Sequence, residues 1–225
     1  MAVAQTECRQ CGTCCANGGP ALHSEDKRLI MSGAIPRAHL ITIRKGELVH
    51  NPVTSRLQSV SKELIKISGI GKRWSCFYFD PEEKGCTIYD KRPQACQALE
   101  CWDTAAVEEM IDKDLLNRGD LIDREDKMFQ AVQDHETGFP CPDLKNIINN
   151  PISEDTSELE ERANSEVKFR TELVARHDLS LGEELFYFGR PLFHLMISVG
   201  ARVRESSNRL LITWPQSSQS QSSLK

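Results

Sequence analysis

The chain has 225 residues, of which 39% are hydrophobic and 27% are charged, and its formal net charge is −5. Such a composition is typical of a globular protein that is long enough to bury a core without disulfide bonds. The net charge gives no overall basic field that would favour nucleic acid, and no apolar run reaches the roughly 20 residues of a membrane span. We therefore expect neither a nucleic-acid partner nor a membrane.

The first part of the chain reads as irregular, with short strands. Residues 1–20 are expected to form a loop, and residues 25–31 a short helix that Ser24 caps, with two acids in its first turn. Apolar and β-branched runs predict short strands, which cover residues 39–43, 47–50 and 63–67.

Two further β-prone runs, residues 76–79 and 86–89, flank a connection that contains proline and glycine. This arrangement predicts a hairpin that carries both Cys76 and Cys86. Pro93 then suits the first turn of a helix.

After residue 102 the apolar residues recur at helical intervals. We expect helices over residues 107–115, 122–138 and 159–174. The densest apolar segment, residues 181–203, is interrupted by Gly189-Arg190-Pro191, which should break any helix there.

These patterns predict an α+β fold, in which a small irregular cysteine-rich metal-binding domain with short β-hairpins is wrapped by C-terminal α-helices. We expect a cysteine-cluster metal-binding domain over residues 1–102 and a helical extension packed on it over residues 103–214. Residues 215–225 are mostly Ser and Gln, and a disordered tail is expected there.

Eight of the nine cysteines fall into two groups and are the candidate metal ligands. They are Cys8, Cys11, Cys14, Cys15, Cys76, Cys86, Cys96 and Cys101. Since the N-terminus shows no basic-then-apolar leader, we expect a cytoplasmic protein, in which clustered thiols stay reduced and bind metal more often than they form disulfides. Metal ions are the expected partners, whereas a protein partner and the oligomeric state are left open.

The spacing of the first group favours an iron–sulfur cluster over zinc or iron ions. Cys8, Cys11 and Cys14 form the C-x2-C-x2-C run of bacterial ferredoxins, whereas structural zinc sites use tetrahedral sulfur pairs. Neighbouring side chains such as Cys14 and Cys15 point in different directions, which suits two metal ions or two corners of a polynuclear centre. Because neither group alone gives a satisfactory site, we expect both to converge on one region.

For three other residues the sequence allows both a functional and a structural role. Arg92 is expected to hold its loop through backbone carbonyls rather than to pair with a substrate. His135 is either a non-thiolate ligand or proton donor, or a helix-end histidine that is satisfied locally. Cys141 is a candidate buried small hydrophobe. No Ser-His-Asp or Cys-His arrangement can be read from the sequence, so the catalytic residues are unknown and enzymatic activity is undecided.

The run CRQCGTCC, followed by Cys86-Thr87-Ile88-Tyr89-Asp90-Lys91-Arg92-Pro93 and Cys96, resembles the CxxCxxCC cysteine-cluster family. This family is also called YkgJ-type, or the zinc- or iron-chelating domain. The resemblance covers residues 8–101 and implies a metal-binding domain. Flagellin lysine-methylating enzymes resemble the family in their cysteine cluster, which raises a link to methylation. This chain departs from the short family form through its long insert between Cys15 and Cys76 and through its C-terminal helices.

The sequence is therefore consistent with three functions. The first is a metalloprotein with an iron–sulfur centre that acts in redox chemistry, in electron transfer or as part of a modifying enzyme. The second is a zinc-stapled structural or protein-interaction module. The third is a metal-dependent enzyme that modifies protein, which depends on analogy with the family.

Overall fold

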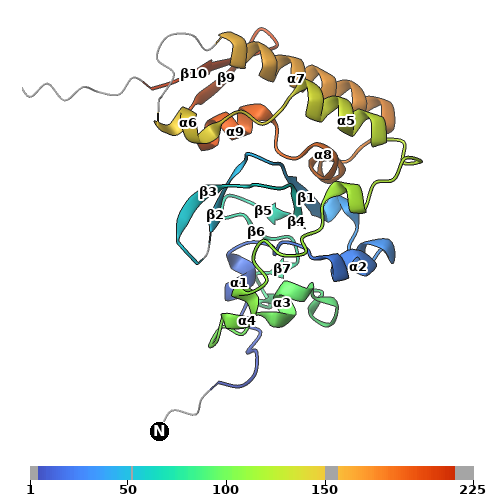
Figure 1. Ribbon diagram of the computed structural model, residues 1–225, viewed down its shortest axis with the longest axis vertical. Helices are drawn as coiled ribbons and strands as arrows, with labels where there is room; N and C mark the ends of the chain where they lie inside the picture. Colours follow the sequence, from blue (N-terminus) through green and yellow to red (C-terminus); the bar gives the residue numbers. More distant parts are fainter. Residues whose placement is uncertain (1–4, 52, 150–156, 216–225) are drawn as a thin grey trace, which may run out of the picture.

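The computed structural model describes residues 5–51, 53–149 and 157–215, and these residues form the expected α+β fold. Figure 1 shows three tiers, with the cysteine-bearing segments at one end, short antiparallel hairpins in the middle and the C-terminal helices packed against them at the other end. No helix among the described residues is both long enough and apolar enough to cross a membrane.

The cysteine-bearing end consists of very short elements. They are α1 (Thr13–Ala16), β5 (Gly69–Ile70), β6 (Ser75–Cys76), β7 (Phe79–Asp80), β8 (Gly85–Cys86), η3 (Tyr89–Lys91), α3 (Gln94–Ala98) and α4 (Ala105–Glu108). The predicted hairpin exists as β7 paired with β8, with Phe79 opposite Cys86. The prediction that it also carries Cys76 was wrong, because Cys76 lies opposite Gly69 in the separate hairpin of β5 and β6.

The middle tier confirms the three predicted strands and adds a fourth. β1 (Leu40–Ile43) pairs with β4 (Leu64–Ile67), and β2 (Leu48–Asn51) pairs with β3 (Arg56–Ser59), both antiparallel. All four residues of β1 are buried, as its apolar and β-branched sequence predicts. No local pattern predicted β3, which is mostly polar and largely exposed.

The predicted helix at residues 25–31 is present as η1 (Ser24–Asp26) followed by α2 (Lys27–Met31). The cap is one residue earlier than expected, because the carboxylate of Asp26 accepts a hydrogen bond from the backbone N–H of His23 at 2.9 Å. A further short turn, η2 (Arg37–His39), leads into β1.

The C-terminal tier contains the long helices. Its elements are η4 (Arg118–Asp120), α5 (Phe129–Gly138), α6 (Leu144–Asn149), α7 (Ser157–His177), α8 (Leu181–Phe188), α9 (Leu192–Ser198), β9 (Arg202–Ser206) and β10 (Arg209–Thr213). The long helix predicted over residues 159–174 and the break at Gly189-Arg190-Pro191 are confirmed.

Two predicted helices are shorter than their apolar spacing suggested. α4 ends at Glu108, and the backbone at Asp112 and Asp114 is left-handed, with φ of 60° and 47°, so a helix cannot continue to residue 115. α5 begins only at Phe129, and Ile122 precedes it in an irregular segment.

One buried cluster joins both halves of the chain. Leu22, Ile65 and Tyr78 from the first half share it with Phe186 and Phe188 of α8. α8 packs across η2 and β1, which fixes the C-terminal helices to the middle tier. The domain boundary at residue 102 stays a prediction, and the tail at residues 216–225 lies outside the described residues.

Candidate metal centre

The first cysteine group reaches the second through an unusually close backbone approach at Gly12. Its φ is +74°, and a Cβ atom there would lie 2.4 Å from the Phe79 ring and 2.6 Å from the carbonyl oxygen of Lys84. Only glycine allows the start of α1 to lie directly on the β7–β8 hairpin. This contact places Cys14 and Cys15 of α1 beside Cys86.

The two cysteine groups approach each other in this region. Cys14 and Cys86 are the side chains that raise the pKa of Cys15, and Cys15 and Cys86 pack against the same buried cluster. Cys96 on α3 lies within the electrostatic reach of Cys14, Cys76 and Cys86. α1, β6, β8 and α3 thus each contribute to this inner group of Cys14, Cys15, Cys76, Cys86 and Cys96.

The other three candidate ligands are exposed, and each has a local polar partner instead. The backbone N–H of Gln10 donates to Cys8 Sγ at 3.4 Å, the Cys11 sulfur lies 3.3 Å from the Thr13 hydroxyl, and the Gln5 amide donates to Cys101 Sγ at 3.5 Å. Cys8 also interacts with the Tyr89 hydroxyl, which ties it to the second group. We call Cys8, Cys11 and Cys101 the outer group.

The backbone N–H of Gln10 donates to the sulfur of Cys8, two residues before it. The backbone N–H groups of Thr13, Tyr78 and Ile88 hold the same position relative to Cys11, Cys76 and Cys86, and each acts to lower the pKa of its cysteine. Backbone donors of this kind stabilise a thiolate relative to a thiol and tune a bound metal. The cysteine loops are thus already shaped to present sulfur as an anion.

The hydrogen bonds among the inner thiols divide them electrostatically. The pKa values of Cys14 and Cys86 fall to about 6, first because Cys15 donates to their sulfurs and further because of the positive charge of Arg92. The same hydrogen bonds raise the pKa of Cys15, so it keeps the proton. Burial raises the pKa of Cys76, and raises that of Cys96 to about 12.

Arg92 holds its loop as expected. Its Nε donates to the carbonyl oxygen of Tyr89 at 2.9 Å, and its guanidinium carbon lies 3.7 Å from the centre of the Tyr89 ring. A second polar pair lies on the other side, where the Tyr78 hydroxyl is 2.7 Å from His39 Nδ1. Burial, followed by the charges of Cys76 and Cys86, raises the pKa of Tyr78 to about 12.

The inner group consists of thiols, which are suitable ligands for zinc and iron. Their sulfur atoms are not, however, placed around a common point as the ligands of a bound metal are. Within the described residues, no three or more His, Cys, Asp or Glu side chains are grouped so that they would hold a metal ion. The inner thiols interact as proton donor and acceptor, so Cys15 would have to give up its proton before all of them could ligate. Soft thiolates suit zinc and iron–sulfur centres, and metal binding in such sites releases protons.

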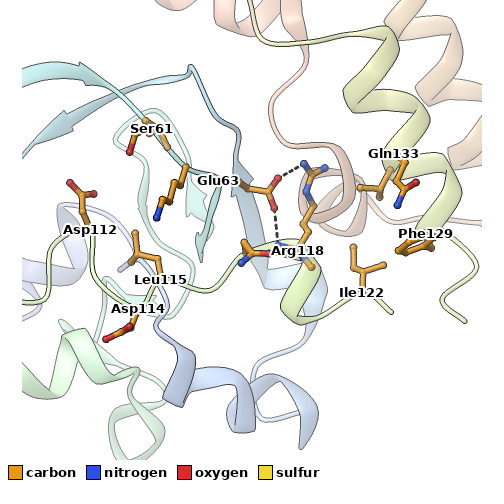
Figure 2. A pocket seen from close by; sticks show the side chains of 14 residues that line it. Ser61, Glu63, Asp112, Asp114, Leu115, Arg118, Ile122, Phe129 and Gln133 are labelled. Atoms are coloured by element: carbon orange, nitrogen blue, oxygen red, sulfur yellow. Dashed lines mark hydrogen bonds and ion pairs between the residues drawn. The ribbon is translucent and has the colours of Figure 1, made fainter. Parts of the chain in front are cut away.

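A groove of about 810 Å³ lies elsewhere in the structure (Figure 2). The ion pair of Arg118 with Glu63 lies at its centre, and Ile122 and Phe129 line one end. None of the eight candidate cysteines lines this groove.

His135 is not placed with the cysteines in any contact that the structure records. Its side chain is completely buried in α5, and its Nε2 lies 2.9 Å from Glu166 Oε1 of α7. This contact supports a structural role for His135, but its partner lies on α7 and not in the local segment that the sequence suggested. Cys141 is also apart, since it packs in the cluster of buried residues around α9 and its sulfur lies against Gly46.

The sequence reasoning missed a buried network of charged side chains. Arg44 is 0% exposed and its Nε lies 2.8 Å from Glu136 Oε1, which is also 2.7 Å from Arg118 Nη2. Glu47, likewise 0% exposed, lies 2.6 Å from Arg190. In a sequence, a single charged residue among apolar ones is typical of a surface position. No local pattern therefore predicted that these charged side chains would be buried.

The match to known proteins is confined to the cysteine-rich part of the chain. No curated protein and no solved structure is similar enough to the chain to count as a match. Residues 7–115 match the family model CxxCxxCC, described as "Putative zinc- or iron-chelating domain". The matched residues include all eight candidate cysteines and exclude Cys141 and the C-terminal helices. Residues 7–115 of this chain are thus a CxxCxxCC domain.

Proposed function

We propose that this chain chelates a polynuclear metal centre through its two cysteine groups, with Cys14, Cys15, Cys76, Cys86 and Cys96 as the inner ligands. The observation that carries the proposal is the close approach of α1 to the β7–β8 hairpin at Gly12, which brings the first cysteine group beside Cys86 of the second. Five gathered thiols exceed the four of a tetrahedral zinc site, and adjacent Cys14 and Cys15 suit two metal ions or two corners of a cluster. Cys8, Cys11 and Cys101 complete the proposed ligand set.

An iron–sulfur cluster is the centre that we favour, with a redox or electron-transfer role or a place in a modifying enzyme. The C-x2-C-x2-C run supports it, and so do the backbone N–H donors to sulfur, which tune the potential of such centres. Iron–sulfur chemistry in reduced thiols fits a cytoplasmic location, which we include in the proposal. When bound, the cluster would supply one-electron transfer. Arg92 and the backbone donors would offset the charge of the thiolates.

A zinc-stapled structural module is the second candidate, and one observation favours it. Cys76 belongs to the main buried cluster, against which Cys15 and Cys86 also pack. A metal ion that joined them would connect α1, β6 and β8, which are each two to four residues long and too short to be stable alone. The peripheral position of Cys8 and Cys11 also suits this candidate better than a ferredoxin-like cluster.

Anaerobic purification followed by iron, zinc and acid-labile sulfide analysis tests both candidates. Stoichiometric iron and sulfide with a brown colour supports the first, and colourless protein with stoichiometric zinc supports the second. Folded protein that binds no metal and has all eight thiols free would refute the proposal.

The matched variants are Cys86→Ser and Cys141→Ser. The first removes a sulfur from the inner group and should lower both metal content and melting temperature. The second removes a partly buried sulfur that lies against Gly46, outside the inner group, and should leave metal content unchanged. Equal metal loss in both variants would show that metal content follows general stability rather than ligation.

A further inference from the structure

We propose that a second site, apart from the cysteines, binds a basic side chain of a peptide, either an arginine guanidinium or a lysine ammonium group. The site is a pocket of about 230 Å³, which is lined by His23, Gln94, Met110 and three acidic side chains. One of these acids, Asp114, also lines the groove of Figure 2, so the pocket and the groove adjoin. No cysteine lines either of them, and this inference is therefore independent of the proposed metal centre.

Hydrogen bonds hold the walls of the pocket together. The backbone N–H of Ser24 donates to the carbonyl oxygen of Asp114 at 2.8 Å. The buried carboxylate of Asp26 accepts from the backbone N–H groups of both His23 and Gln94, at 2.9 and 2.8 Å. Three segments that are far apart in the sequence thus meet at fixed positions, and the pocket is preformed.

One ring nitrogen of His23 is a buried acceptor that lacks a donor. His23 is 5% exposed, and its Nε2 lies 3.3 Å from the carbonyl oxygen of Met110. Because a carbonyl oxygen only accepts, Nε2 carries the proton and Nδ1 of the neutral ring is the acceptor. Nδ1 has no partner among the described residues, since the nearby N–H of Asp26 bonds instead to the His23 carbonyl oxygen at 2.8 Å. A buried acceptor of this kind favours a ligand that donates a hydrogen bond.

The charge of the pocket selects a cation as that donor. The carboxylates of Glu25, Glu109 and Asp114 line it, and Lys113 is the one basic side chain beside them. Within the described residues, none of the three carboxylates has a hydrogen bond or an ion pair. These side chains are also not grouped as the ligands of a metal ion. Ammonium and guanidinium groups supply both the positive charge and the N–H donors that this lining lacks.

The groove extends the site beyond a single side chain. Its volume of about 810 Å³ is that of sites for ligands much larger than one basic group. Figure 2 shows Asp112 and Asp114 at one end of it, and Ile122 and Phe129 at the other. A polyamine is charged along its whole length and would gain nothing from the apolar end. A peptide can place a basic side chain in the pocket and an apolar one against Ile122 and Phe129, and so matches both ends.

Isothermal titration calorimetry of the full-length protein tests the proposal. The probe is an acetylated and amidated peptide with one arginine and one phenylalanine, which are separated by glycine and serine spacers of several lengths and placed in both orders. We expect saturable binding for at least one of these peptides, and a lower affinity as salt is added. The same peptide with citrulline, which is neutral and similar in shape, in place of arginine should lose binding.

Substitutions in the pocket test its charge. Glu109→Gln and Asp114→Asn each neutralise one exposed carboxylate and should weaken binding by about two- to fivefold, as is usual for an exposed ion pair. Lys113→Gln removes the competing cation and should strengthen binding by a similar factor. Glu172→Gln, on the exposed face of α7 and outside both the pocket and the groove, should leave the affinity unchanged.

The hydrogen bond to His23 has a spectroscopic signature. In protein with isotopically labelled histidine, the nitrogen resonance of His23 Nδ1 should move upfield when the peptide binds, because an unprotonated imidazole nitrogen then accepts a hydrogen bond. A resonance that does not move would contradict the role of His23.

Failure of every peptide to bind, or equal affinity for the arginine and citrulline peptides, would overturn the proposal. Wild-type affinity in both Glu109→Gln and Asp114→Asn would do the same. If spermidine bound as tightly as the best peptide and the phenylalanine were dispensable, the pocket would hold a free amine, and the peptide would be the wrong ligand.

Discussion

His135 Nε2 lies 2.9 Å from Glu166 Oε1, and both side chains are completely buried. The same carboxylate accepts a hydrogen bond from Arg170 Nε at 3.1 Å and from the backbone N–H of Leu192 at 2.6 Å. One glutamate of α7 thus connects α5, α7 and the start of α9. Because these donors are buried, the hydrogen bonds to this carboxylate replace bonds that the donors would make to water in the unfolded chain.

Replacement of Glu166 by alanine should therefore lower the free energy of unfolding by about 3–5 kcal/mol, since it leaves the buried His135 Nε2, Arg170 Nε and Leu192 N–H without their acceptor. Urea denaturation at neutral pH measures the change.

The matched control on the same helix is Glu158→Ala. Glu158 also pairs with an arginine, Arg162, but its side chain is 84% exposed. Its loss should change the free energy of unfolding by no more than about 0.5 kcal/mol. Similar losses for the two variants would mean that the buried network does not stabilise the fold.

Glu136 makes a pH-dependent contribution to stability. Burial opposes its ionisation, but the nearby His135 side chain and the charges of Arg44 and Arg118 outweigh burial and lower its pKa below the ordinary 4.5. A carboxyl group whose pKa is lower in the folded state stabilises the fold above its unfolded pKa, and this stabilisation is lost as the pH falls through the folded value. Glu136→Gln should thus be less stable than the wild type at pH 7.

The difference between the wild type and Glu136→Gln should shrink as the pH falls below 4.5. Denaturation curves at a series of pH values measure it. Glu172→Gln, on the exposed face of α7, should show no comparable trend. A difference for Glu136→Gln that stays constant down to pH 3 would contradict the assignment.

The predictable parts of the fold are those in which local pattern and burial agree. β1 is apolar and fully buried, and α7 keeps its helical spacing over 21 residues. In both, neighbouring residues in the sequence decide the structure. The hairpin of β9 and β10 and the strand β3 were missed because each strand is short and β3 and β9 are mostly polar or charged, so their pairing depends on the strand opposite.

The candidate site was predictable in its residues but not in its internal arrangement. Cysteine spacing identified the two groups and the need for them to converge. It could not place Cys76 and Cys86 in different hairpins, and it could not separate the inner group from the outer one. Those features depend on the contact of Gly12 with Phe79 and Lys84, which links residues about 70 positions apart.

Residues 216–225 should be dispensable for metal binding and stability. Their sequence is almost entirely Ser and Gln and offers little apolar surface to bury. A chain that ends at residue 215 should keep the metal content and melting temperature of the full chain. Loss of either, in protein purified side by side, would show that the tail has a structural role.

Gly12 allows a direct test of how the two cysteine groups are brought together. Gly12→Ala should lower metal content and melting temperature, because the new methyl group would lie 2.4 Å from the Phe79 ring and 2.6 Å from the Lys84 carbonyl oxygen. The backbone must shift to relieve both contacts, and such overpacking typically lowers the free energy of unfolding by about 1–3 kcal/mol. The left-handed backbone at Gly12 adds a further penalty for alanine.

Gly33→Ala is the control that separates the steric contact at Gly12 from the cost of a left-handed alanine. Gly33 has the same φ of +74°, and a methyl group added there would meet nothing within 4 Å. Gly33→Ala should therefore lose only the penalty of a left-handed alanine, about 1 kcal/mol, and should keep its metal. Metal content by elemental analysis and unfolding by denaturant measure the two effects independently. If Gly12→Ala kept full metal content with no greater loss of stability than Gly33→Ala, the close approach of α1 to the β7–β8 hairpin would not be what joins the cysteine groups.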